Sequence, residues 1–134
     1  MTTQRHEIEA WLGDFADELT DDQINDLVRI SDEIEARYPD PDDEDERRAA
    51  MTVAHRLMVE DHDDVVDELA QRLRAARLAQ IEALAGIRQA ALILVQDHPR
   101  GRPDAPEVTT ASGFARRAGV DRSAVIGWRE SEGK

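Results

Sequence analysis

Apolar residues recur every three or four positions through most of the chain, a spacing that places them on one face of an α-helix. The first run, residues 5–19, sets an apolar stripe against an acidic face. Thr20 followed by Gln23 is typical of a capping box and predicts the start of a second helix. That helix should end at Tyr38, because Pro39 disfavours a helical conformation in the residue before it.

Three aromatic side chains fall on these two predicted helices. Trp11 and Phe15 lie on the apolar stripe of the first, and Tyr38 ends the second. Aromatic rings bury large areas and dominate the energetics of cores, so we expect these three to anchor the core of this region. The alternative is an aromatic box that binds a ligand.

Residues 46–95 predict helix almost throughout, since they contain no proline and a single glycine. Asp40 can cap this region with Pro41 at the first helical position, where a missing N–H costs nothing. The polar run at residues 60–64 is the expected place for a break and a new helix start. The helix over residues 64–96 would then be about 50 Å long, at roughly 1.5 Å per residue.

Apolar residues along this long helix alternate at spacings of three and four, with a lapse at Gln80, which favours a helix–helix seam. No small domain covers such a helix alone, so either the preceding helices fold back along it or a second copy of the chain does. A homodimer is the expected form. The seam comprises Val66, Leu69, Leu73, Ala76, Ala83, Ile87, Ala90 and Leu94, and Leu78, Ile81, Leu84, Leu92 and Val95 widen it.

Charge is segregated along the chain. Residues 1–64 hold 21 acidic and 6 basic side chains, a net charge of −15, whereas residues 65–134 hold 9 and 11, a net charge of +2. Only the second half could approach a phosphate backbone, because the first would be repelled from it. The acidic half is expected to serve assembly or to bind a protein partner.

The sequence offers no candidate for catalysis, a cofactor or a metal. It contains no cysteine, which removes disulfides and thiolate zinc sites. His55 and His62 lie seven residues apart, not the four of a helical zinc motif, and we expect them to be solvated residues near a helix junction. The acidic run at residues 42–46 lacks the glycine of a calcium loop. We therefore expect neither an enzyme nor a metal protein.

A cytoplasmic protein without a membrane segment is expected. Charged residues come too early in the chain for a signal peptide, and no stretch offers eighteen uninterrupted apolar residues. The lack of cysteine agrees with a reducing compartment.

Residues 110–129 are the only stretch that points to a specific chemistry, because they predict two short helices joined by a tight turn. Gly119 falls at the turn, where glycine adopts a positive φ without steric cost. Asp121 can cap the second helix through its side-chain oxygen. The inner faces of this pair would bury Phe114, Ala115, Ala118, Val120, Val125 and Trp128.

This stretch resembles the helix-turn-helix of bacterial and phage transcriptional regulators and recombinases. That motif has an apolar residue, Ala, two variable residues, an apolar residue, Gly and an apolar residue, then Val or Ile and an apolar residue three further on. These positions are here Phe114, Ala115, Arg116, Arg117, Ala118, Gly119, Val120, Val125 and Trp128. The resemblance implies that residues 121–130 form a recognition helix in the major groove of double-stranded DNA.

The resemblance also implies which side chains meet the bases. Arg122 would pair with guanine, Ser123 would contact a base or a phosphate, and Ile126 would pack on a thymine methyl group. Arg129 shares their outward face by helical spacing. The alternative is a helical hairpin whose arginines are only solvated.

Four further arginines are expected near DNA. Arg116 and Arg117, at the end of the first helix, are placed to meet phosphates. Arg100 and Arg102 lie in residues 99–103, Pro-Arg-Gly-Arg-Pro, which resemble the core of an AT-hook that lies in the minor groove. A solvent-exposed linker is the alternative for this segment.

We therefore expect an all-α protein with an acidic helical region over residues 1–63, a long helix over 64–97 and a three-helix helix-turn-helix domain over 84–130. The expected function is sequence-specific DNA binding by a small transcriptional regulator, whose dimer would span half-sites about 34 Å apart. The alternative is an acidic protein-interaction module or DNA mimic whose C-terminal helices are structural.

Overall fold

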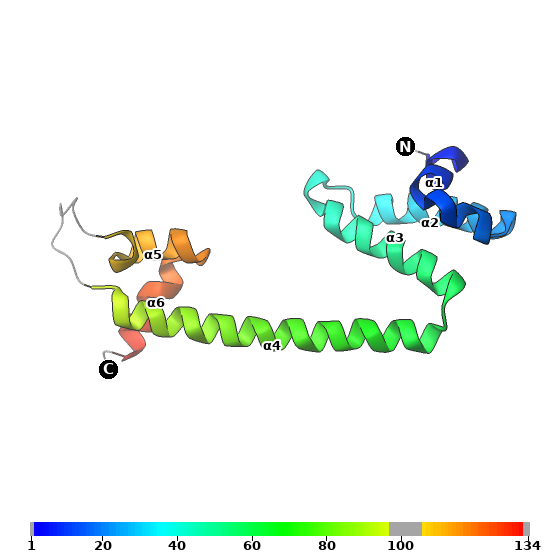
Figure 1. The fold of residues 1–134 in the computed structure, drawn as a ribbon. Coiled ribbons are helices and arrows are strands. Elements are labelled where there is room, and N and C mark those ends of the chain that lie inside the picture. Colours follow the sequence, from blue (N-terminus) through cyan, green and yellow to red (C-terminus); the bar gives the residue numbers. More distant parts are fainter. Residues whose placement is uncertain (1, 97–105, 133–134) are drawn as a thin grey trace. The chain divides into compact units, whose positions relative to one another are not determined.

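The structure is a computed structural model that describes residues 2–96 and 106–132. Its α-helices are α1 (Arg5–Leu12), α2 (Asp21–Arg37), α3 (Glu44–Val59), α4 (His62–Leu94), α5 (Ala111–Ala118) and α6 (Arg122–Glu132), with 3-10 segments η1 (Gly13–Glu18), η2 (Pro41–Asp43) and η3 (Glu107–Thr109) (Figure 1). No strand occurs in the described ranges, which confirms the all-α prediction. The chain divides within α4 into two compact units, residues 1–71 and 72–134.

Local sequence signals fix both ends of α2, by a side-chain cap at its start and by Pro39 after its end. The Thr20 hydroxyl oxygen accepts the Gln23 N–H at 3.2 Å, and the Gln23 side-chain oxygen accepts the Thr20 N–H at 2.9 Å. This confirms the predicted capping box, in which two otherwise unpaired N–H groups are satisfied together. At the other end α2 stops at Arg37, and Tyr38 leaves the helical conformation before Pro39, as predicted.

The single helix predicted over residues 5–19 is wrong. Gly13 has a φ of 59°, in the region that favours glycine, and α1 therefore ends at Leu12 before the 3-10 segment η1. The apolar stripe still reaches the core of the first unit on both sides of this break. That core buries Ile8, Leu12, Leu19, Ile24 and Leu27.

Trp11 and Phe15 are not the core anchors that the sequence predicted. The two residues are 43% and 54% exposed, and their rings lie against the His55 ring, with centroid separations of 6.1 and 5.5 Å. Leu12, not its neighbour Trp11, takes the buried position of α1, and the break at Gly13 moves Phe15 off the helical stripe. His55 is half-buried under both rings and is therefore not the solvated residue expected of it.

Short polar contacts close the turn between α2 and α3. The Asp40 carboxylate accepts the Asp42 N–H at 2.9 Å, so Asp40 caps η2 with Pro41 in its first turn. Arg47 donates to the carbonyl oxygens of Tyr38 and Asp40 at 2.7 and 2.6 Å. These bonds tie the start of α3 to the end of α2.

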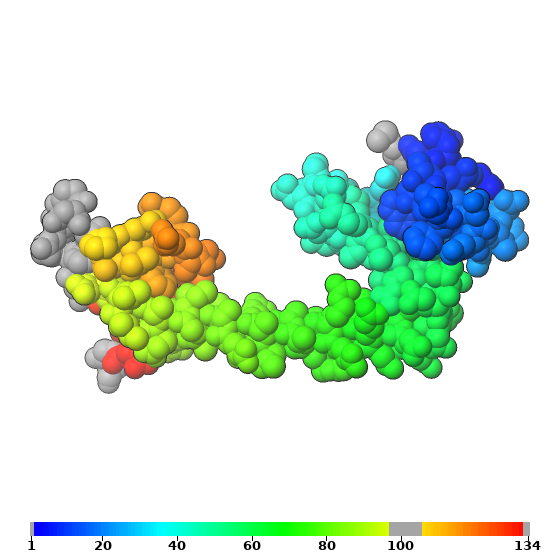
Figure 2. Space-filling view, in the orientation of Figure 1, coloured from blue at the N-terminus to red at the C-terminus, as the bar shows by residue number. Residues whose placement is uncertain are grey.

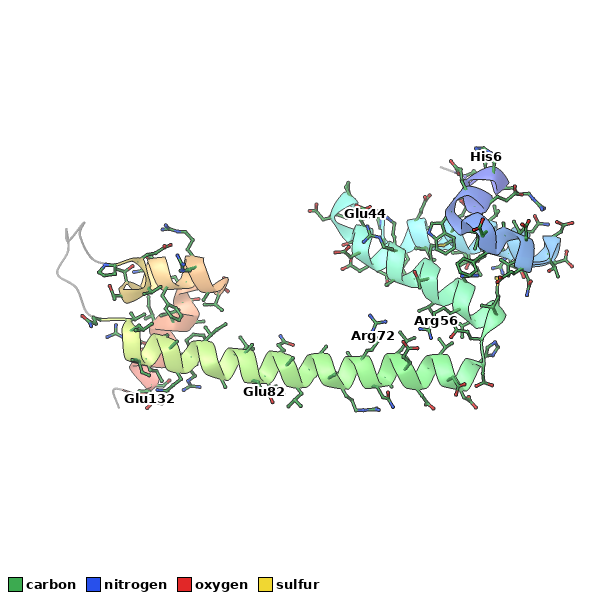
Figure 3. The ribbon with its side chains drawn as sticks, viewed as in Figure 1. His6, Glu44, Arg56, Arg72, Glu82 and Glu132 are labelled. Atoms are coloured by element: carbon green, nitrogen blue, oxygen red, sulfur yellow. The ribbon has the colours of Figure 1, made fainter. Side chains whose placement is uncertain are left out.

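The break between α3 and α4 falls at residues 60–61, inside the predicted run. Arg56, which is labelled in Figure 3, lies at this corner. It donates to the carboxylates of Glu60 and Glu68, which raises the pKa of Arg56 and lowers that of Glu60. His62 Nε2 donates to the Leu57 carbonyl oxygen at 2.9 Å. The corner is therefore held by polar bonds on its surface.

In the second unit, α5 and α6 pack against the C-terminal end of α4 (Figure 1). The Gln96 N–H donates to the Thr109 carbonyl oxygen at 2.9 Å and joins the end of α4 to η3. Within the described ranges, no helix is both long and apolar enough to cross a membrane. The core of this unit buries Ala91, Val95, Phe114, Ala115 and Val125, with Ile87, Ala90, Ala118, Val120 and Trp128 around it.

Leu27→Ala should destabilise the first unit by about 2–5 kcal/mol, because Leu27 is fully buried and its loss leaves a cavity. Hydrogen exchange of α2 amides would report this within the intact chain. Val66→Ala is the control, since Val66 is 58% exposed near the start of α4. Equal protection of α2 in both variants would contradict the assignment of Leu27 to the core.

Candidate nucleic-acid interface

The start of α5 is fixed by a close contact that the sequence did not reveal. The Thr110 hydroxyl accepts the Gly113 N–H at 3.1 Å and donates to the Glu107 carbonyl oxygen at 3.2 Å. A Cβ atom at Gly113 would lie 2.2 Å from that carbonyl oxygen, so no larger residue fits without a shift. The available signal was a glycine in the first turn of a predicted helix.

The turn between α5 and α6 has the conformation predicted for it. Gly119 lies in the left-handed region, with φ 73° and ψ 32°. The Ala115 carbonyl oxygen accepts both the Gly119 and Val120 N–H groups at 3.0 Å. This arrangement satisfies orphan groups at the end of α5 and sets the direction in which α6 begins.

Asp121 begins α6 through its backbone and not through the side-chain cap that the sequence predicted. Its carbonyl oxygen accepts the N–H groups of Ala124 and Val125 at 3.1 and 3.3 Å. In the described part of the chain, its carboxylate accepts no hydrogen bond. The carboxylate therefore remains on the surface beside the first turn of α6.

One face of α6 packs inward and its first turn is open. Val125 is fully buried, and Arg122 and Ser123 are exposed. Ile126 and Arg129, predicted on the same outward face, are half-buried. Arg122 makes no ion pair with any described residue, so its guanidinium is available to a ligand.

Two more arginines lie at the end of α5. Arg116 and Arg117 are 76% and 70% exposed, and each approaches a Glu107 carboxylate oxygen, at 4.0 and 3.6 Å. Ion pairs this exposed contribute little, so a phosphate could replace Glu107 at small cost. The other predicted arginines, Arg100 and Arg102, lie outside the described residues.

The second unit, which carries α5 and α6, has a net positive charge, as an anion-binding surface requires, whereas the first unit is strongly acidic. Residues 72–134 contain 11 basic and 7 acidic side chains, whereas residues 1–71 contain 6 and 23. Among the residues that the structure describes, no cluster of side chains could hold a metal ion. No protein-family model, curated protein or solved structure matches the chain. The candidate interface therefore depends on its own geometry and charge.

Gly113→Ala should destabilise the second unit by about 1–3 kcal/mol, because the new methyl group would collide with the Glu107 carbonyl oxygen. Gly127→Ala is the control. It lies within α6, its Cβ would meet nothing within 4 Å, and it should stabilise the helix by roughly 0.5–1 kcal/mol. Hydrogen exchange of α5 and α6 amides would separate the two. An unchanged or more protected Gly113→Ala variant would show that η3 moves freely away from α5.

Proposed function

We propose that the chain binds double-stranded DNA through α5 and α6, with the first turn of α6 in the major groove, and acts as a small transcriptional regulator. The observation that carries this proposal is the exposure of Arg122 and Ser123 at the start of a helix that follows a left-handed Gly119 turn. In recognition helices of this kind, residues near the N-terminus contact base edges. The role would place the protein in the cytoplasm.

Base contacts are assigned by side-chain chemistry. The guanidinium of Arg122 can donate two hydrogen bonds to O6 and N7 of guanine, and the Ser123 hydroxyl can contact a base or a phosphate. Ile126 offers apolar atoms to a thymine methyl group. Arg129 lies two turns beyond Arg122 and is proposed to meet the edge of the site.

Phosphate contacts would set the register of the complex without reading sequence. Arg116 and Arg117 support this role, since both guanidinium groups are largely exposed. Arg100 and Arg102 are proposed as minor-groove or phosphate contacts on the sequence alone. Together these contacts would make affinity strongly dependent on salt.

The acidic unit favours a second candidate function. Residues 1–71 carry a net charge of −17, and no charged side chain is buried among the described residues. Such a surface suits a basic protein partner. In that case the unit would act as an interaction module or DNA mimic, and α5 and α6 would be structural.

Arg122→Ala should weaken binding to the preferred site by about tenfold to a hundredfold and relax selection at one base pair, since a bidentate contact is worth about 1–3 kcal/mol of discrimination. Selection from a random duplex library, at two salt concentrations, would measure both effects. Arg29→Ala is the control, because it removes the same charge from α2, where Arg29 pairs with Glu33. If no duplex is retained even at low salt, the DNA proposal is wrong and the acidic module is favoured.

Arg117→Ala should weaken binding to all duplexes alike and reduce the slope of log affinity against log salt by about 1, because one phosphate contact is lost. Titrations of one selected and one scrambled duplex across a salt series would measure the slope. Arg122→Ala provides the contrast, since its loss should fall mainly on the selected duplex. An unaltered slope would remove Arg117 from the interface.

A further inference from the structure

A stretch of α4 has no partner in the structure. Every residue from Gln71 to Gly86 is exposed (Figure 2), including Leu73, Leu78 and Ile81 at 50%, 57% and 64%. Most helical stability in proteins comes from packing of an apolar face against another element. This segment, which we call the bare segment, therefore requires a cover.

A second unpartnered apolar surface lies in the first unit, between α2 and α3. It is an open groove of about 550 Å³, and Glu33, Arg37 and Glu46 are its charged residues. A hydrophobic groove between two helices is a common binding site for the apolar face of an amphipathic helix. The apolar lining includes Ile30, Ile34, Ala50, Val53 and Leu57.

The bare segment has the chemistry that this groove would bind. Leu78, Ile81 and Ala85 follow the spacing i, i+3, i+7 at which a helix inserts its anchors into a groove. Arg74 and Arg77 lie on the same side by helical spacing, and neither makes an ion pair with a described residue.

Charge also favours this pairing. By helical spacing the anchor side of the bare segment carries Arg74, Arg77 and Glu82, and Arg72 lies on the opposite side with Ala79. This side is therefore net positive, whereas residues 1–71 have a net charge of −17. Figure 3 shows Arg72 and Glu82 projecting away from α4 into solvent. The attraction would therefore act between the bare segment and the rim carboxylates of the groove.

We propose that two copies of the chain associate by reciprocal docking, with the bare segment of each in the α2–α3 groove of the other. A second copy of the chain brings the same groove with its carboxylates, and it is the partner that we assign to the bare segment. Reciprocal docking closes the assembly at two copies. This assembly goes beyond the DNA proposal and does not depend on it.

Sedimentation of the full chain over a concentration series tests the assembly without DNA. The parent should form a dimer, and Ile81→Glu should weaken association at least tenfold, because a carboxylate would enter the apolar groove. Ala79→Glu adds the same charge to an exposed position on the opposite side of α4 and should associate as the parent does. A parent that stays monomeric at all concentrations would overturn the proposal.

The groove is tested by Ala49→Arg, since Ala49 is exposed and lines the groove, so that the new side chain obstructs it and repels the arginines of the bare segment. Association should again fall at least tenfold. Thr52→Arg, also exposed on α3 but outside this groove, is the control. Circular dichroism would verify that each variant remains helical.

A mixture of the Ile81→Glu and Ala49→Arg chains distinguishes reciprocal docking from pairing of two α4 helices. Each variant alone should be largely monomeric, whereas the mixture should form a heterodimer with one intact pairing, identified by its mass in native mass spectrometry. Dimerisation of Ala49→Arg at parent strength, or no heterodimer in the mixture, would overturn reciprocal docking.

Discussion

Burial of a few aliphatic side chains in two separate clusters holds this chain together. Charged residues make up 35% of the sequence and aromatic residues 4%, so little apolar surface is available to be removed from water. Leu27 centres one cluster and Val125 the other, and both are fully buried. Because each cluster is small, the directions of the helices also depend on backbone geometry at their ends, and the site on α5 and α6 is a consequence of that geometry.

Structural features that depend on only a few neighbouring residues could be predicted from the sequence. The capping box at Thr20 and Gln23, the left-handed Gly119 and the break at residues 60–61 each depend on neighbours within one helical turn. The all-α fold followed from apolar spacing for the same reason. Exposure of Arg122 and Ser123 also followed, since Val125 had to face inward from the same helix.

Features that depend on distant contacts could not be predicted. Trp11 and Phe15 lie on an apolar stripe, but which stripe residues become buried depends on the helix that packs there, and their rings meet His55 instead of the core. Gly113 is required by the carbonyl oxygen of Glu107, and a glycine in the first turn of a predicted helix does not reveal which atom approaches it. Gly13 illustrates a different difficulty, since a glycine within a periodic run predicts a break only weakly.

Segregation of charge connects the two proposals. An acidic unit of −17 opposes non-specific attraction to DNA, so a useful affinity would have to come from local contacts such as that of Arg122 with a base. The same acidic unit would attract the arginines of the bare segment of a second copy. Salt should therefore weaken both DNA binding and assembly, although the two interactions use different apolar side chains. Substitution of Ile81 removes an apolar anchor of assembly and leaves α6 unchanged. A mutation can therefore separate assembly from DNA binding, whereas a change in salt concentration affects both.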